Sequence, residues 1–155
     1  MPSRHLSIRV PEATLAHLAT EARRARTTPS NLARTLIEEG LRMSAHPGIV
    51  FREGAAGRRP ALAVGPDVWE IVRALNGINA QREPSAAALR VAESDPDQSV
   101  RKLAESINLT VAQIHNALRY YADYRDEIDE WIARAEEYAE RAEAAWRREQ
   151  AILTR

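Results

Sequence analysis

Residues 4–10 read Arg-His-Leu-Ser-Ile-Arg-Val, and this stretch decides the predicted fold of the N-terminal part of the chain. Apolar and polar residues alternate along it, so a strand here has one apolar face and one polar face. A lone strand leaves its backbone donors and acceptors unpaired. We therefore expect two copies to pair as an antiparallel ribbon across a dimer axis. The side chains on the polar face of that ribbon are His5, Ser7 and Arg9.

Two helices are predicted to follow this strand. Pro11 ends the strand, and the first helix spans residues 12–25. Thr28 followed by Pro29 predicts the start of a second helix, which continues to about Met43. Apolar residues at helical spacing give this second helix a predicted buried face. They are Leu32, Ala33, Leu36, Ile37 and Leu41.

This order of strand, proline and two helices resembles the ribbon-helix-helix family of dimeric DNA-binding proteins (the Arc, MetJ and CopG group) over residues 4–43. The resemblance implies that the outward strand residues contact bases in the major groove, where a two-stranded ribbon fits. It also implies that the start of the second helix holds a phosphate. The implied DNA contacts are His5, Ser7, Arg9, Thr28, Ser30 and Asn31. The alternative is a dimerisation module whose polar ribbon face is only solvated.

The composition limits the classes of protein that the chain can belong to. Its 155 residues allow one medium domain or two small ones, and the absence of cysteine excludes disulfides and thiol chemistry. We see no membrane-length apolar run and no secretory signal, so we expect a cytoplasmic protein without membrane contact. The net charge is zero, but residues 1–46 carry seven Arg against four Glu. The basic end of the chain therefore coincides with the predicted DNA-binding domain, residues 1–45.

The middle of the chain, residues 46–123, is predicted to hold a hairpin and a second pair of helices. Residues 49–52 and 59–64 flank a glycine-rich tip, and Asp67 precedes an apolar helix. Residues 99–121 have the pattern of a helix-turn-helix, in which Thr110 caps the second helix. The polar side chains that such a helix would expose as a second set of DNA contacts are Gln113, His115, Asn116 and Arg119. A helical packing module without DNA contact explains this pattern equally well.

Residues 46–131 resemble a family of antitoxin-type domains that are encoded beside PIN-type ribonuclease toxins of the VapBC kind. The matching motifs are His46-Pro47-Gly48-Ile49, Gly57-Arg58-Arg59-Pro60, Val68-Trp69 and the stretch that contains Tyr120-Tyr121-Ala122. This chain has a longer polar connection over residues 76–98 than that pattern. The resemblance implies that the protein neutralises a toxin.

The last segment, residues 124–155, is predicted to form one long amphipathic helix, since it contains neither proline nor glycine. Apolar residues recur at steps of three and four, and such a stripe needs a partner. With the family resemblance, the favoured partner is a toxin groove. The expected contacts are Ile128, Trp131, Ile132, Tyr138, Arg141, Trp146 and Arg147. The alternatives are a second copy of this helix or the protein's own domain.

Catalysis is not expected, because the four histidines are scattered and no residue pattern predicts a metal, cofactor or phosphate-binding loop. The predicted fold class is mainly α, with a ribbon-helix-helix dimer, a hairpin plus helix-turn-helix and a long C-terminal helix. The leading hypothesis is an antitoxin of a type II toxin-antitoxin system that also represses transcription of its own operon. The alternatives are a free-standing dimeric ribbon-helix-helix repressor without a toxin and an architectural scaffold.

Overall fold

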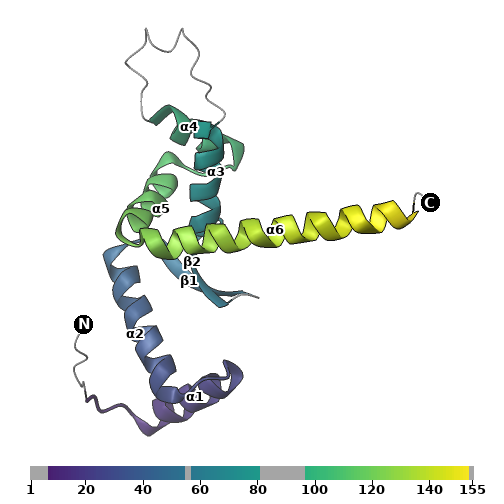
Figure 1. The fold of residues 1–155 in the computed structure, drawn as a ribbon. Helices are drawn as coiled ribbons and strands as arrows, with labels where there is room; N and C mark the ends of the chain where they lie inside the picture. Colours follow the sequence, from purple (N-terminus) through teal and green to yellow (C-terminus); the bar gives the residue numbers. More distant parts are fainter. Residues whose placement is uncertain (1–6, 55–56, 81–96, 154–155) are drawn as a thin grey trace. The chain divides into compact units, whose positions relative to one another are not determined.

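The computed structural model describes residues 7–54, 57–80 and 97–153 and is mainly helical, with one small antiparallel sheet (Figure 1). The chain divides into two compact units, Met1–Ala45 (unit 1) and His46–Arg155 (unit 2). The elements in chain order are α1 (Glu12–Arg24), α2 (Pro29–Ala45), β1 (Ile49–Gly54), β2 (Gly57–Leu62), α3 (Val68–Ala80), α4 (Asp97–Ser106), α5 (Val111–Asp123) and α6 (Arg125–Leu153).

Unit 1 is a pair of helices joined by a tight turn. Arg26 has a positive φ of 52°, and the Thr27 amide donates to the carbonyl of Ala22 at 2.9 Å, which closes the end of α1. The hydroxyl of Thr28 accepts a hydrogen bond from the Asn31 amide at 3.2 Å, so the predicted cap of α2 is confirmed. The two predicted helices are therefore present at the expected places.

The described part of the predicted strand, residues 7–10, does not form a strand in the single chain. Residues 4–6 lie outside the described residues, and Ser7–Val10 form neither strand nor helix. The physical reason is that a strand requires a hydrogen-bonded neighbour, and the neighbour expected for this one is a second copy of itself.

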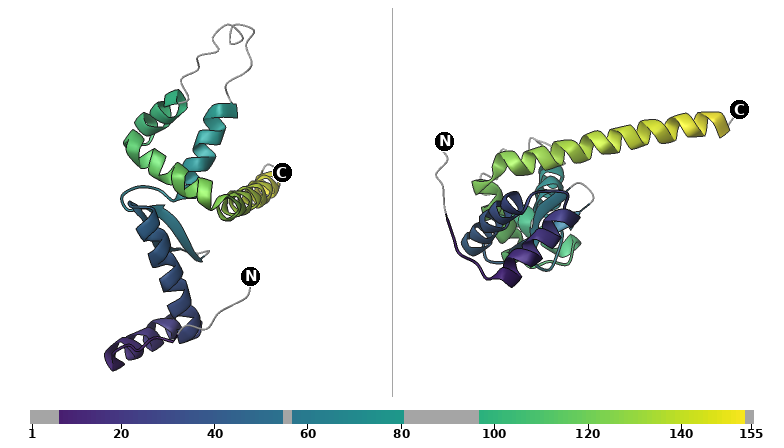
Figure 2. Two further views of the ribbon diagram at one scale, coloured as in Figure 1. Left: turned by 90° about the vertical axis from the view of Figure 1, so that its left-hand side faces the viewer. Right: turned by 90° about the horizontal axis from the view of Figure 1, so that it is seen from below.

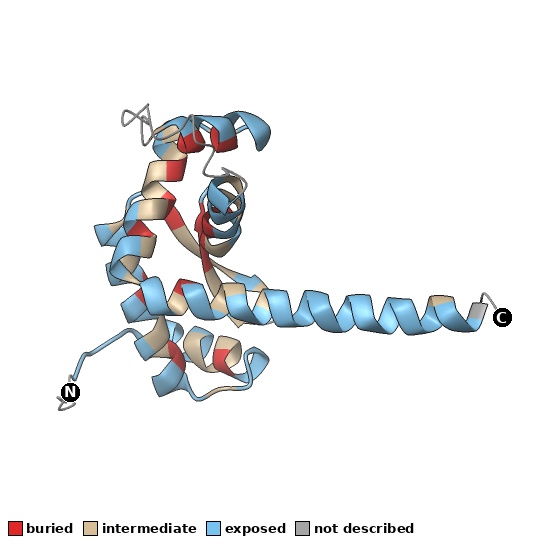
Figure 3. Ribbon diagram, turned by 45° about the horizontal axis from the view of Figure 1, so that its top comes forward, coloured by how far each residue is buried: buried red, intermediate tan, exposed pale blue. Residues whose placement is uncertain are grey.

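Unit 2 is built around the β1–β2 hairpin and four helices. The hairpin is paired from Ile49 opposite Leu62 to Gly54 opposite Gly57, as the glycine-rich tip predicted. α3 and α5 pack against the hairpin, α4 packs on α3 and α5, and together they enclose one continuous apolar core (Figure 3). α5 contacts all the other elements of this unit, which makes it the central helix.

Several details of unit 2 differ from the prediction. The sequence predicts irregular structure over residues 76–82, but residues 76–80 continue α3, because the partly buried Ile78 packs against the core. Asp67 stands before α3 as expected, but its carboxylate contacts Arg59 and Trp69 rather than a helix-start amide. The Glu70 side chain caps the helix start instead, since its carboxylate accepts from the Asp67 amide at 2.9 Å. Residues 84–93, whose alanine-rich sequence predicts a short helix, lie outside the described residues.

α6 begins after a break at Tyr124 and continues for 29 residues. Its first turns pack on unit 2 through Ile128, which is fully buried, and through the partly buried Ile132. In the views of Figures 1 and 2, its C-terminal part extends beyond the other elements of unit 2. None of the described helices is both long enough and apolar enough to cross a membrane.

Candidate nucleic-acid and protein interfaces

The predicted DNA contacts of unit 1 lie on its exposed surface. His5 lies outside the described residues, whereas Ser7 and Arg9 are both exposed. Ser7 and Ser30 line one open groove between the N-terminal segment and α2, together with Arg34. The structure therefore brings one predicted base contact and one predicted phosphate contact to the same groove.

The first turn of α2 presents its polar side chains to solvent. Thr28, Ser30 and Asn31 are all exposed, and the Thr28 hydroxyl is already used as the helix cap. No acidic residue lies in this first turn, so its amides and partial positive charge are not screened by a local carboxylate. The arrangement suits an anion such as a DNA phosphate.

Unit 1 also exposes much of its apolar surface. Its described large apolar side chains that are between 36% and 67% exposed are Ile8, Val10, Leu15, Leu36, Ile37, Leu41 and Met43. The predicted buried face of α2 is therefore wrong for the isolated chain at Leu36, Ile37 and Leu41, because α1 covers only Leu32 well. This exposed set is a candidate interaction surface, and periodicity alone did not predict that it is exposed.

The second set of predicted DNA contacts, on α5, is used within unit 2. Gln113 completes the capping box with Thr110 and donates to the Val64 carbonyl at 3.0 Å. His115 lies 3.3 Å from the Asp97 carboxylate, and Asn116 accepts from Arg119.

These contacts revise the helix-turn-helix interpretation. A recognition helix needs a free polar face for base edges, but Gln113, His115 and Asn116 are partly buried, and only Arg119 of the four is exposed. Through these contacts α5 helps to hold unit 2 together, and DNA contact by these four residues stays a prediction.

The base of α6 is fixed to the hairpin by charged and aromatic contacts. Arg59, whose side chain is one-quarter exposed, lies 2.7 Å from the carboxylate of Asp67. The guanidinium groups of Arg59 and Arg134 lie 5.7 and 5.3 Å from the centre of the Trp131 ring. The tryptophan is thus held between two cations of its own unit.

These contacts correct the predicted partner surface at its N-terminal end. Ile128 belongs to the core, and Trp131 and Ile132 are partly covered by unit 2, so these three residues hold α6 in place. The sequence predicts them as partner contacts because the same apolar spacing continues from the covered part of the helix into the free part. The sequence does not predict the Arg59–Asp67 pair, because the two residues meet only after the hairpin has folded.

α5 and α6 are also linked by a hydrogen bond from the Tyr121 hydroxyl to the Asp129 carboxylate at 2.8 Å. Burial and this hydrogen bond raise the pKa of the Tyr121 phenol above its usual value. The Asp129 carboxylate accepts a hydrogen bond from the neutral phenol, but its negative charge would repel a phenolate. The contact therefore favours the protonated tyrosine.

The remaining predicted partner contacts are exposed on the free part of α6. Tyr138 is 77% exposed and Trp146 is 59% exposed. Arg141 pairs with Glu137, and Arg147 lies 2.6 Å from Glu143, in both cases four residues away on the same helix. Such exposed pairs are weak, so these arginines can turn toward a partner at little cost.

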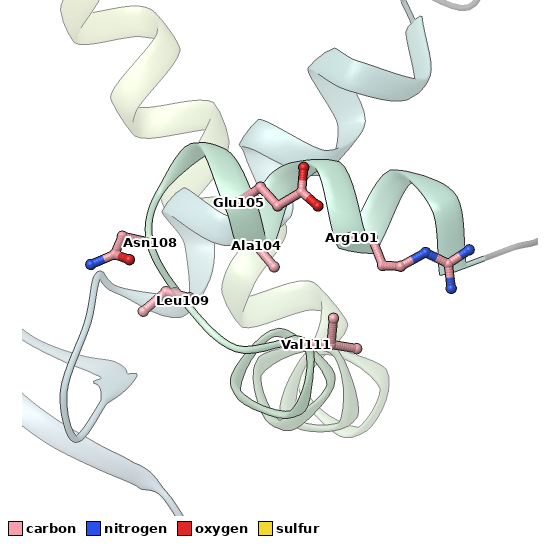
Figure 4. Close-up of a pocket in the computed structure, with 6 residues that line it drawn as sticks. All are labelled: Arg101, Ala104, Glu105, Asn108, Leu109 and Val111. Carbon is pink, nitrogen blue, oxygen red and sulfur yellow. The ribbon is translucent and has the colours of Figure 1, made fainter.

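A small open pocket lies at the turn between α4 and α5 (Figure 4). The residues that line it are Arg101, Ala104, Glu105, Asn108, Leu109 and Val111. Its two charged side chains have opposite signs, so the lining favours no ligand of a single charge. Among the described residues, no cluster of three or more histidines or carboxylates lies so as to bind a metal ion.

Compared with models of known protein families, with curated proteins and with solved structures, the chain gives no significant match.

Proposed function

We propose that the protein is a dimeric DNA-binding repressor of the antitoxin type. In this proposal unit 1 pairs with a second copy and binds operator DNA, while the free part of α6 binds a protein partner. The leading partner is a PIN-like ribonuclease toxin, as the resemblance in residues 46–131 implies.

The observation that carries the proposal is the exposed apolar surface of unit 1. Ala22 and Leu32 are the only buried apolar residues in the described part of this unit. Two helices with so little buried surface gain too little from the hydrophobic effect to offset the loss of chain entropy. A second copy would cover Leu36, Ile37 and Leu41 and supply the missing core.

The same second copy would complete the ribbon. Residues 4–10 of two chains can pair as antiparallel strands, with Ile8 and Val10 turned toward the helices and Ser7 and Arg9 turned outward. Each chain adds a charge of +3 over residues 1–46, so a dimer presents a basic surface to the phosphates.

The experiment that tests DNA binding compares Arg9→Ala with Arg119→Ala on the DNA upstream of the gene. An arginine that forms two hydrogen bonds with guanine contributes about 1–3 kcal/mol of discrimination, so Arg9→Ala should weaken specific binding about 5- to 150-fold. Arg119 is exposed on α5, outside the proposed ribbon, and its replacement should leave binding unchanged. Competition with unrelated DNA separates specific from non-specific affinity.

The two variants also define what would overturn the assignment. If Arg9→Ala is still a dimer in sedimentation and keeps the DNA sequence preference of the wild type, the ribbon does not contact the bases. A loss of specific binding in Arg119→Ala alone would restore the helix-turn-helix interpretation.

The proposed binding of a protein partner by α6 is tested by co-expression with the neighbouring open reading frame. The wild-type chain should rescue growth from a toxic neighbour and copurify with it. Trp146→Ala should weaken this complex by about 2 kcal/mol or more, because buried tryptophans often dominate interface energies. Rescue that persists without copurification, or recovery of homo-oligomer only, would favour the free-standing repressor.

A further inference from the structure

The free part of α6 carries a wide apolar face that no other described element of unit 2 covers. From Ala135 onward the described side chains are exposed, apart from the partly buried Ala135 and Gln150 (Figure 3). At 1.5 Å per residue this part is about 28 Å long. Helical spacing places seven described apolar residues on one face. They are Ala135, Tyr138, Ala139, Ala142, Ala145, Trp146 and Ile152.

The two borders of this face carry opposite charges. Arg134, Arg141 and Arg148 recur every seven residues and lie along one border. Glu136 and Glu143, also seven residues apart, lie along the other border. A spacing of seven keeps each row on nearly the same side of the helix, so the apolar face has one mainly basic edge and one mainly acidic edge, on which Arg147 lies beside Glu143.

We propose that the free part of α6 pairs with the α6 of a second copy, side by side and in the same direction. In a parallel pair related by a two-fold axis, the basic edge of each helix faces the acidic edge of the other. Arg141 of one copy then lies beside Glu143 of the second copy, and the same contact repeats across the axis.

The opposite orientation has no such match. In an antiparallel pair, the acidic edges face each other on one side and the basic edges face each other on the other side. The charge pattern therefore discriminates between the two orientations. The small side chains of Ala135 and Ala142, in the middle of the face, allow the two helices to approach closely.

The free part of α6 does not fold back onto unit 2, because α6 runs as one continuous helix from Arg125 to Leu153. One residue opposes the pairing. Glu149 lies seven residues after Ala142, in the middle of the apolar face, and two copies of it would meet near the axis. It stands close to the helix end, where two helices can separate at little cost.

A pair of this length is weak by itself, and its stability rests on the proposed dimer of unit 1. Linking two chains at one end makes the second contact intramolecular, with an effective concentration in the millimolar range for short flexible links. The partner proposed above would use the same face, so a toxin would have to separate the two α6 helices. Partner binding is then linked to the state of the dimer.

Disulfide formation tests the pairing directly, because the chain has no cysteine of its own. Ala142→Cys places a thiol in the middle of the apolar face. Ala144→Cys, two residues further on, places an equally exposed thiol on the opposite face. Under mild oxidation of the full-length protein, Ala142→Cys should give about ten-fold more disulfide-linked dimer than Ala144→Cys. Equal yields would overturn the proposal.

Two further variants determine the direction. In a parallel pair, Ala135→Cys and Glu149→Cys each crosslink with their own copy. In an antiparallel pair centred on Ala142, they crosslink with each other when mixed and not with themselves, which would overturn the parallel arrangement. Glu149→Leu in the Ala142→Cys background should raise the yield, since it removes two like charges from the axis, and a lower yield would contradict the assigned face.

The state of unit 1 is measured in the same samples by sedimentation of the reduced Ala144→Cys variant. A dimer that gives no Ala142→Cys crosslink would overturn α6 pairing and leave the proposed function intact. A monomer at every concentration would contradict both.

Discussion

Unit 2 encloses twelve apolar residues in one continuous core, whereas unit 1 buries only Ala22 and Leu32 among its described residues. The two units have similar kinds of residues but place them differently. In unit 2, apolar side chains from distant elements, such as Ile49, Ile71 and Ile114, meet one another. In unit 1, the apolar side chains of α2 meet solvent. The comparison shows that unit 2 has a core of its own, whereas unit 1 leaves most of its apolar side chains exposed, as we expect if it pairs with a second copy.

The largest expected effect is on the unit 1 dimer. Ile37→Glu would place a carboxylate in the interface without a partner, which typically costs about 3–5 kcal/mol, or roughly a hundred- to several thousand-fold in dissociation constant. Val64→Glu in unit 2 is the matched control, since Val64 is 77% exposed and outside the proposed interface. Sedimentation should show monomer for Ile37→Glu and dimer for Val64→Glu. Dimers of equal strength would contradict the interface.

The next effect concerns the core of unit 2. Ile114 is fully buried on α5, so Ile114→Ala should lower the free energy of unfolding of this unit by about 2–5 kcal/mol. The three tryptophans, Trp69, Trp131 and Trp146, all belong to unit 2, so urea unfolding followed by tryptophan fluorescence reports on this unit. A loss below 1 kcal/mol would mean that α5 is not central.

The sequence predicted most elements because their signals are local. The Thr28 and Thr110 caps and the glycine-rich tip of the hairpin act over three or four residues, and the structure has the corresponding helices and hairpin. How many sides of a helix are covered depends on residues that lie far away in the sequence, so local patterns do not predict it. The pattern of α5 indicated one buried face, but Gln113 and His115 contact Val64 and Asp97, which lie far away in the sequence.

For the candidate surfaces, too, local patterns predicted an apolar face but not what covers it. A periodic stripe identified α6 as an element that needs a partner, but it could not show where its own unit stops covering it, between Ile132 and Tyr138. In unit 1, the apolar spacing of α2 predicted that this face is buried, but it could not show whether the same chain or a second copy covers it. DNA binding and toxin binding stay predictions from the sequence of this chain.

The smallest effect is on the contact between α5 and α6. Tyr121→Phe removes the hydrogen bond to Asp129 and should destabilise unit 2 by about 0.5–1.5 kcal/mol near neutral pH. Since folding raises the pKa of this phenol, its contribution is present below the usual tyrosine pKa of about 10 and is lost as pH rises through the folded value. Between pH 8 and 11 the free energy of unfolding should therefore decline less steeply with pH in Tyr121→Phe than in the wild type. Identical slopes would contradict the role of this hydroxyl.

The difference between the units is tested most directly by hydrogen exchange of the intact protein at several concentrations. On dilution below the dissociation constant of the dimer, amides of α1 and α2 should lose protection, while those of α3 and α5 keep theirs. Protection of α1 and α2 that does not change on dilution to monomer would contradict the claim that unit 1 needs a second copy.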